Sequence, residues 1–163
     1  MKTLTIDHKN GHFSKYQLIE DGRDLPIAYH EETPSELIEQ LESYLECWKQ
    51  FNRFVNLARG RKFKPEDEDQ FLEIKSIIIQ ELEFILSSIE VASPTRDEVH
   101  ALIGGAPSLR FLAEMQEGAL RNLESQWHKI YIGWHSILGQ LKVKLTAEQT
   151  KSMFSSLAGD RKK

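Results

Sequence analysis

The sequence is poor in residues that cross-link a fold or interrupt it. Its 163 residues include one cysteine, Cys47, so no disulfide bond can form within the chain. None of the 5 prolines lies in the interior of a long segment with a helical apolar period. Proline inside such a segment would break a helix. The chain can therefore form long, uninterrupted helices.

The sequence also lacks long hydrophobic runs and a dominant charge. No uncharged stretch approaches the roughly 20 residues of a membrane-spanning helix, and no secretory signal pattern opens the chain. The net charge is −4, with 28% charged and 40% hydrophobic residues. This balance is typical of a globular protein and gives no general attraction to nucleic acid or to an anionic membrane. With a single cysteine, we expect a cytoplasmic protein that makes no membrane contact.

Residues 2–30 differ from the rest of the chain, because turn signals at 9–11 and 21–22 contain glycine, which tolerates a positive φ. The first turn places Leu4 opposite Tyr16. Continued through the second turn, the pairing puts these apolar residues on one face: Leu4, Ile6, Tyr16, Leu18, Leu25 and Ile27. We predict a small three-stranded antiparallel β-meander that packs on the helices.

Start and stop signals divide the remaining chain into helices. Thr33-Pro34-Ser35-Glu36 is a strong helix start, and Ser108 and Thr146 supply further N-cap oxygens. The predicted helices are 34–59, 65–91, 95–103, 108–144 and 147–157, before a frayed tail at 159–163. The fold class is mainly α: an antiparallel bundle of three long helices with short extra helices, in a single domain over 1–163.

The segment 108–144 is the longest of these helices, about 54 Å at 1.5 Å per residue. One stripe along it is apolar except for a gap between Leu112 and Leu120. Its members are Leu109, Leu112, Leu120, Leu123, Trp127, Ile130, Trp134, Ile137, Leu138 and Leu141. A single helix cannot bury such a stripe, so the other helices must cover it.

Two sets of apolar residues lie outside the main stripes. Helix 65–91 carries a second row, and helix 108–144 carries three residues off its stripe, near glycines that permit close helix contact. The residues are Leu72, Ile79, Leu86, Phe111, Ile132 and Val143. We expect them to form an interface, either in a homo-oligomer or with another protein partner.

A basic turn follows helix 34–59. Its cationic residues are Arg53, Arg59, Arg61, Lys62 and Lys64, with Phe63 among them. Such a cluster can bind phosphate or a nucleic-acid backbone. Four acidic residues follow at 66–69 and can neutralise it. An accessory nucleic-acid-binding subunit is therefore the alternative function.

Residues capable of chemistry are few. Glu124 and His128 are four residues apart and could donate two metal ligands, but His128 and His135 lie about 10 Å apart along a helix and cannot bind one ion together. We expect an ordinary Glu–His surface pair. Cys47 has no basic neighbour in the sequence, so we expect a structural thiol.

The segment His100-Ala101-Leu102-Ile103-Gly104 resembles the phosphorylated motif of histidine-phosphotransfer domains over about five residues. Ile103 stands where those domains usually carry lysine. Pro94 and Pro107 also confine the histidine to a short helix, so a packing or capping role is expected for His100.

The sequence contains no phosphate loop, dinucleotide fingerprint, nucleophile elbow or paired-cysteine motif. We therefore expect no catalytic residues, metal or cofactor, and a non-enzymatic interaction or adaptor protein. It would self-associate, or dock on a protein partner, through apolar helix surface.

Overall fold

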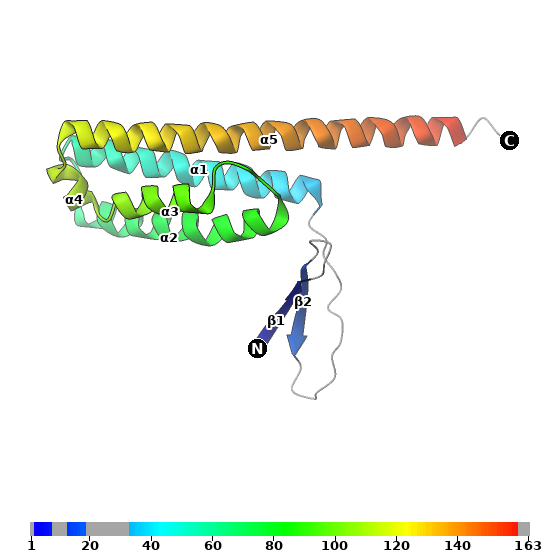
Figure 1. Ribbon diagram of the computed structural model, residues 1–163, viewed down its shortest axis with the longest axis horizontal. Coiled ribbons are helices and arrows are strands. Elements are labelled where there is room, and N and C mark those ends of the chain that lie inside the picture. Colours follow the sequence, from blue (N-terminus) through cyan, green and yellow to red (C-terminus); the bar gives the residue numbers. More distant parts are fainter. Residues whose placement is uncertain (1, 8–12, 19–32, 160–163) are drawn as a thin grey trace. The chain divides into compact units, whose positions relative to one another are not determined.

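The structure is a computed structural model that describes residues 2–7, 13–18 and 33–159. The chain divides into two compact units, Met1–Thr33 and Pro34–Lys163. The described part of the second unit is mainly α. Its helices are α1 (Pro34–Arg59), α2 (Pro65–Ser88), α3 (Arg96–Gly105), α4 (Leu109–Glu114) and α5 (Glu117–Gly159) (Figure 1). The expectation of one domain over 1–163 stays a prediction.

The first unit contains two paired strands, β1 (Lys2–Asp7) and β2 (Phe13–Leu18). They run antiparallel with Leu4 opposite Tyr16, the register that the turn signal at 9–11 predicts. The turn itself and the expected third strand lie outside the described residues. The three-stranded meander and its packing on the helices therefore stay predictions.

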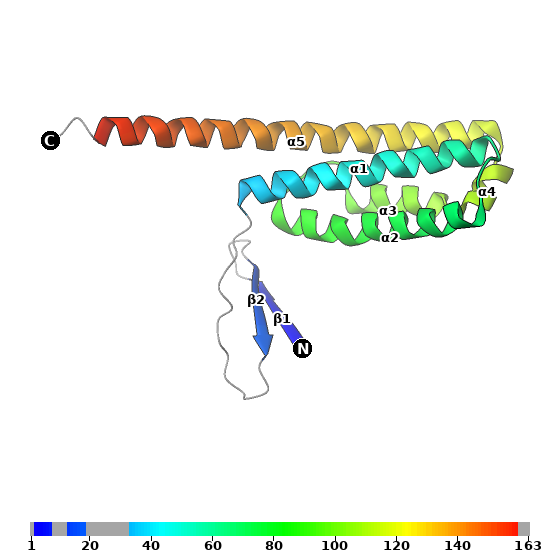
Figure 2. The same cartoon turned by 180° about the vertical axis from the view of Figure 1, so that it is seen from behind.

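Helix α1 is the shared neighbour of the long helices and spans the residues that its start and stop signals predict. It runs antiparallel to both α2 and α5 (Figures 1 and 2). At its centre, Trp48 is fully buried, and its carbonyl oxygen accepts a hydrogen bond from Nε1 of Trp127 at 2.9 Å. The ring centroids of Tyr44 and Trp134 lie 5.4 Å apart, edge to face. Aromatic pairs from α1 and α5 thus join these two helices.

The prediction of one helix over 108–144 is wrong, because the helix breaks at Met115. Met115 has an extended backbone (φ −65°, ψ 143°) and separates α4 from α5. Ser108 does cap α4, since its hydroxyl accepts from the N–H of Phe111 at 3.0 Å. The break lets α4 pack on α1 and α2, whereas α5 packs on α1 and α3. The gap in the apolar stripe marks this change of neighbours.

The prediction of a separate helix over 147–157 is also wrong, because α5 continues to Gly159. Thr146 was expected to cap a new helix. Its hydroxyl instead donates to the carbonyl oxygen of Lys142 at 3.0 Å, a bond that a threonine inside a helix makes. The sequence 146–149 is compatible both with the start of a new helix and with the interior of a continuous one.

The predicted helix 65–91 ends earlier, at Ser88. The hydroxyls of Ser87 and Ser88 bond back to the carbonyl oxygen of Phe84, and Ile89 is extended (φ −137°, ψ 140°). The extended backbone allows Ile89 and Val91 to pack against the core.

The predicted helix 95–103 is shifted to Arg96–Gly105, with Thr95 as its N-cap. Thr95 and Glu98 form a reciprocal capping box, and Glu98 also accepts a hydrogen bond from Lys129 of α5 at 2.7 Å. The Lys129 bond and the backbone N–H of Thr95 lower the pKa of Glu98 to about 2. One carboxylate thus caps α3 and ties it to α5.

The link between α2 and α3 packs on α5 at Gly133. A Cβ atom at this position would lie 2.9 Å from both Cδ and Cγ of Pro94, which is buried. Only glycine leaves room for the proline ring at this distance. By contrast, a Cβ atom at Gly139 of the same helix would meet no described atom within 4 Å.

We predict that Gly133→Ala lowers the free energy of unfolding by about 1–2 kcal/mol, because overpacking outweighs the higher helix propensity of alanine. The matched control Gly139→Ala should be neutral or stabilising by up to about 1 kcal/mol. Urea unfolding of both variants, followed by circular dichroism, measures the difference. Equal stabilities would contradict the close contact with Pro94.

Candidate functional site

Helix α5 is longer than the helix on which it packs. It has 43 residues and α1 has 26, which correspond to about 64 Å and 39 Å. Leu145 still packs against the core, but every residue from Thr146 to Gly159 is exposed. In Figures 1 and 2 the last turns of α5 run past the beginning of α1. We call residues 146–159 the overhang.

One side of the overhang and of the turns before it is apolar. Its large side chains are more than half exposed: Ile132 52%, Val143 70%, Met153 66%, Phe154 69% and Leu157 66%. Helical spacing places them opposite the buried residues Trp134, Ile137 and Leu138. We call this side the outer face of α5. It lies turned away from the bundle core.

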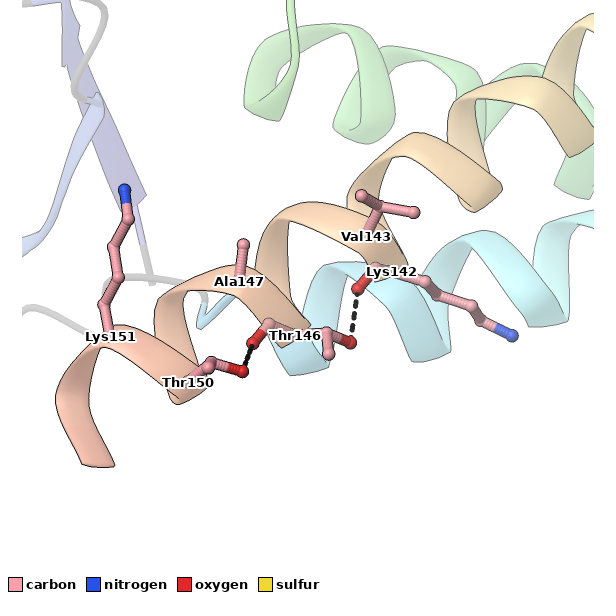
Figure 3. Close-up of a pocket in the computed structure, with 6 residues that line it drawn as sticks. All are labelled: Lys142, Val143, Thr146, Ala147, Thr150 and Lys151. Carbon is pink, nitrogen blue, oxygen red and sulfur yellow. Dashed lines mark hydrogen bonds between the residues drawn. The ribbon is translucent and has the colours of Figure 1, made fainter. Parts of the chain in front are cut away.

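Two threonines in the outer face contribute little polarity. The Thr146 hydroxyl donates to the carbonyl oxygen of Lys142 at 3.0 Å, and the Thr150 hydroxyl donates to that of Thr146 at 2.8 Å (Figure 3). With the hydroxyls bonded to their own helix, the methyl groups are what remains for contact. A shallow hollow here is lined by six α5 residues: Lys142, Val143, Thr146, Ala147, Thr150 and Lys151.

The opposite side of the overhang is polar. The positions that continue the core stripe beyond Leu145 are Glu148, Gln149, Ser152 and Ser156. Beyond Leu145, near the beginning of α1, the side of α5 that continues the core stripe is therefore polar, and the opposite side is apolar.

The six predicted interface residues do not form one surface. Leu72 is 43% exposed and Phe111 50%. They flank one junction, where Glu68 of α2 accepts from the N–H groups of Leu109 and Arg110. Ile132 and Val143 lie on the outer face of α5. The remaining two, Ile79 and Leu86, are partly buried and pack against the core.

Three exposed residues of the outer face were not predicted: Met153, Phe154 and Leu157. They fall in the segment expected to be a separate helix covering the core. Their spacing with Val143 and Thr150 was visible in the sequence. It becomes a continuous face only because α5 does not break at 145–146.

The predicted basic cluster is divided by the fold. Arg59 points to α5, where its Nη1 lies 2.7 Å from Oε1 of Glu124 and its Nε lies 3.5 Å from Oε2 of Glu117. The hydrogen bond with Glu124 raises the pKa of Arg59. Arg53 lines a separate hollow with residues of α1 and Gln70 of α2.

The remaining cations, Arg61, Lys62 and Lys64, are exposed on the turn. Arg61 has a positive φ of 52° in the turn that closes α1, a position where glycine is usual.

The residues considered for chemistry do not converge in the described part of the chain. Glu124 pairs with Arg59 of α1, so the expected surface pair of Glu124 with His128 is wrong. No group of three potential metal ligands occurs among the described residues. His100, His128 and His135 are exposed. Cys47 is half-buried, and burial raises the pKa of its thiol. A raised pKa disfavours the reactive thiolate.

Comparison of the chain with protein-family models, curated proteins and solved structures found no match in any of the three. Within the described residues, no helix is both long enough and apolar enough to cross a membrane.

We predict that Arg59→Ala lowers the free energy of unfolding by about 1–2 kcal/mol, because Glu124 and Glu117 lose their shared cation in a partly buried position. Lys62→Ala is the matched control, since it removes the same charge from an exposed position; it should change stability by less than about 0.5 kcal/mol. Thermal unfolding at low ionic strength compares the two. The role of Arg59 in joining α1 to α5 fails if both variants are equally stable.

Proposed function

We propose that this chain is a non-enzymatic interaction protein that associates through the outer face of α5. The observation that supports this most is the overhang itself: fourteen consecutive residues, 146–159, exposed on a continuous helix. The overhang extends a helix that is already formed, but few side-chain contacts support its end, so its last turns open readily. Contact with a partner would stabilise it.

The size of the surface agrees with a weak specific contact. The four large apolar side chains of the outer face between Val143 and Leu157 expose roughly 500 Å² in one copy, taking about 150–250 Å² for each large side chain. Pairing with a similar surface would bury about 1,000 Å², the size of a weak or transient protein–protein interface. We therefore expect dissociation constants in the micromolar range, a homo-oligomer or a helical protein partner, and no requirement for a cofactor.

We predict that the purified protein shows a mass that rises with concentration in light scattering or sedimentation. Phe154→Lys combined with Leu157→Lys should shift the midpoint of association at least tenfold higher, because each charge would be buried without a partner. The matched control, Ser152→Lys with Ser156→Lys, adds the same charge on the opposite side and should leave association unchanged. A wild-type protein that stays monomeric at several hundred micromolar would contradict self-association.

Binding of a nucleic acid at the basic turn is a second candidate, supported by the three exposed cations Arg61, Lys62 and Lys64. This candidate is weakened because Arg59 is already paired with Glu124 and is not free to bind a phosphate. Salt-dependent binding of a labelled oligonucleotide tests it. Charge reversal by Arg61→Glu and Lys62→Glu should abolish such binding, whereas Arg110→Glu with Lys144→Glu should not. No effect of the turn variants would exclude the turn as the site.

A further inference from the structure

We infer that the occupant of the outer face is a second copy of this chain, and that the two α5 helices pair antiparallel. In this pair Gly139 lies opposite Leu157, Val143 opposite Met153, and Thr146 opposite Thr150 of the other copy. The inference rests on the proposed function above. It specifies the partner, the direction of pairing and the register.

The first support is the spacing of the outer face. Residues 139, 143, 146, 150, 153 and 157 follow one another in steps of four, three, four, three and four. This is the a/d spacing of a heptad, which two helices satisfy by winding around each other. The segment holds no charged residue at these positions. The spacing is thus suited to a helical partner that lies along the overhang.

The second support is that the face is complementary to itself. The three pairs of positions all have their midpoint at residue 148, so a single two-fold axis at this residue relates the two copies. Each pair then occurs twice, once on either side of the axis, which gives six layers of side chains. A symmetric dimer requires such self-complementarity, because the same surface is used by both copies. Leu157, 66% exposed, would fill the space beside Gly139, where an added Cβ meets no described atom within 4 Å. Large residues then face small ones, as packed cores require.

A parallel, in-register pair fits less well. It places Gly139 against Gly139 and leaves a gap, while the largest residues meet at the other end of the segment. The helix dipoles would point in the same direction instead of opposing. Antiparallel pairing removes both penalties.

The core of the helical unit does not oppose this pairing. The apolar residues of α5 that pack on α1 and α3 lie on the other side of the helix, and Trp134 among them is fully buried. Lys142, at the edge of the hollow, forms an ion pair with Glu42 of α1. A second copy on the outer face therefore leaves the apolar contacts of α5 with α1 and α3 in place. Because the other helices pack along the first part of α5, the two bundles would lie at opposite ends of the paired segment.

Cysteine cross-linking in the full chain tests the register. Two proteins are made in a Cys47→Ser background, one with Val143→Cys and one with Met153→Cys. In the antiparallel pair the two new thiols of a mixed dimer share one layer, within disulfide reach. In a dimer of one variant, the identical positions lie about 15 Å apart along the axis, beyond that reach. We expect oxidation to give cross-linked dimer in the mixture, at least tenfold more than in either variant alone.

Three results would overturn the inference. Cross-linking of each variant with itself, and not in the mixture, would show parallel pairing; the proposed function would survive, because the outer face would still be the contact. Dimers that the Phe154→Lys and Leu157→Lys variant disrupts, but that cross-link in no combination, would show a different register. A protein that stays monomeric at all concentrations would show that no second copy binds the outer face.

A control guards against random oxidation. The double substitution Phe154→Lys and Leu157→Lys, introduced into both cross-linking variants, should abolish the mixed product.

Discussion

The difference in length between α5 and its neighbour α1 is the constraint on which this account depends. The two helices pack side by side, and the bundle buries the apolar stripe of α5 only as far as Leu145. Beyond that point the apolar residues change to the other side of the helix. A helix that merely extended too far would have no reason to keep large apolar side chains there. The proposed contact outside the bundle would cover Met153, Phe154 and Leu157, which are all exposed.

The bundle that fixes the position of α5 is held by α1. Ten residues of α1 are buried, and its aromatic residues meet those of α2 and α5. The ion pair between Arg59 and Glu124, together with the bond from Trp127 to the Trp48 carbonyl, joins α1 and α5 at two heights. The link through Pro94 adds a close contact at Gly133. These contacts make the first part of α5 a rigid base for the overhang.

The sequence predicts the elements whose signals are local. Pro34 and Glu36 mark the start of α1, and the serine at 108 caps α4 as expected. The break at Met115 could not be predicted from periodicity alone, because it depends on which helices surround α4. Thr146 shows a second limit: the same residue type caps a helix or bonds back within one, and only the continuation of α5 decides.

The sequence predicted an exposed apolar surface, but it located only some of the residues that form it. Ile132 and Val143 belong to the outer face, whereas Ile79 and Leu86 are half-hidden by the core of their own chain. Arg59 of the basic turn forms ion pairs with acidic residues that lie far away in the sequence; Glu124 is 65 positions from it. Contacts over such separations are set by the tertiary fold, and local charge counting does not reveal them.

Amide hydrogen exchange across the overhang, measured at several protein concentrations, tests the central claim most directly. An unsupported helix end opens readily, whereas a paired one is protected. The account predicts that protection of residues 146–157 rises with concentration, while that of α1 around Trp48 stays constant. Protection in the overhang that is independent of concentration, whether high or absent, would contradict the claim that a second copy covers the outer face of α5.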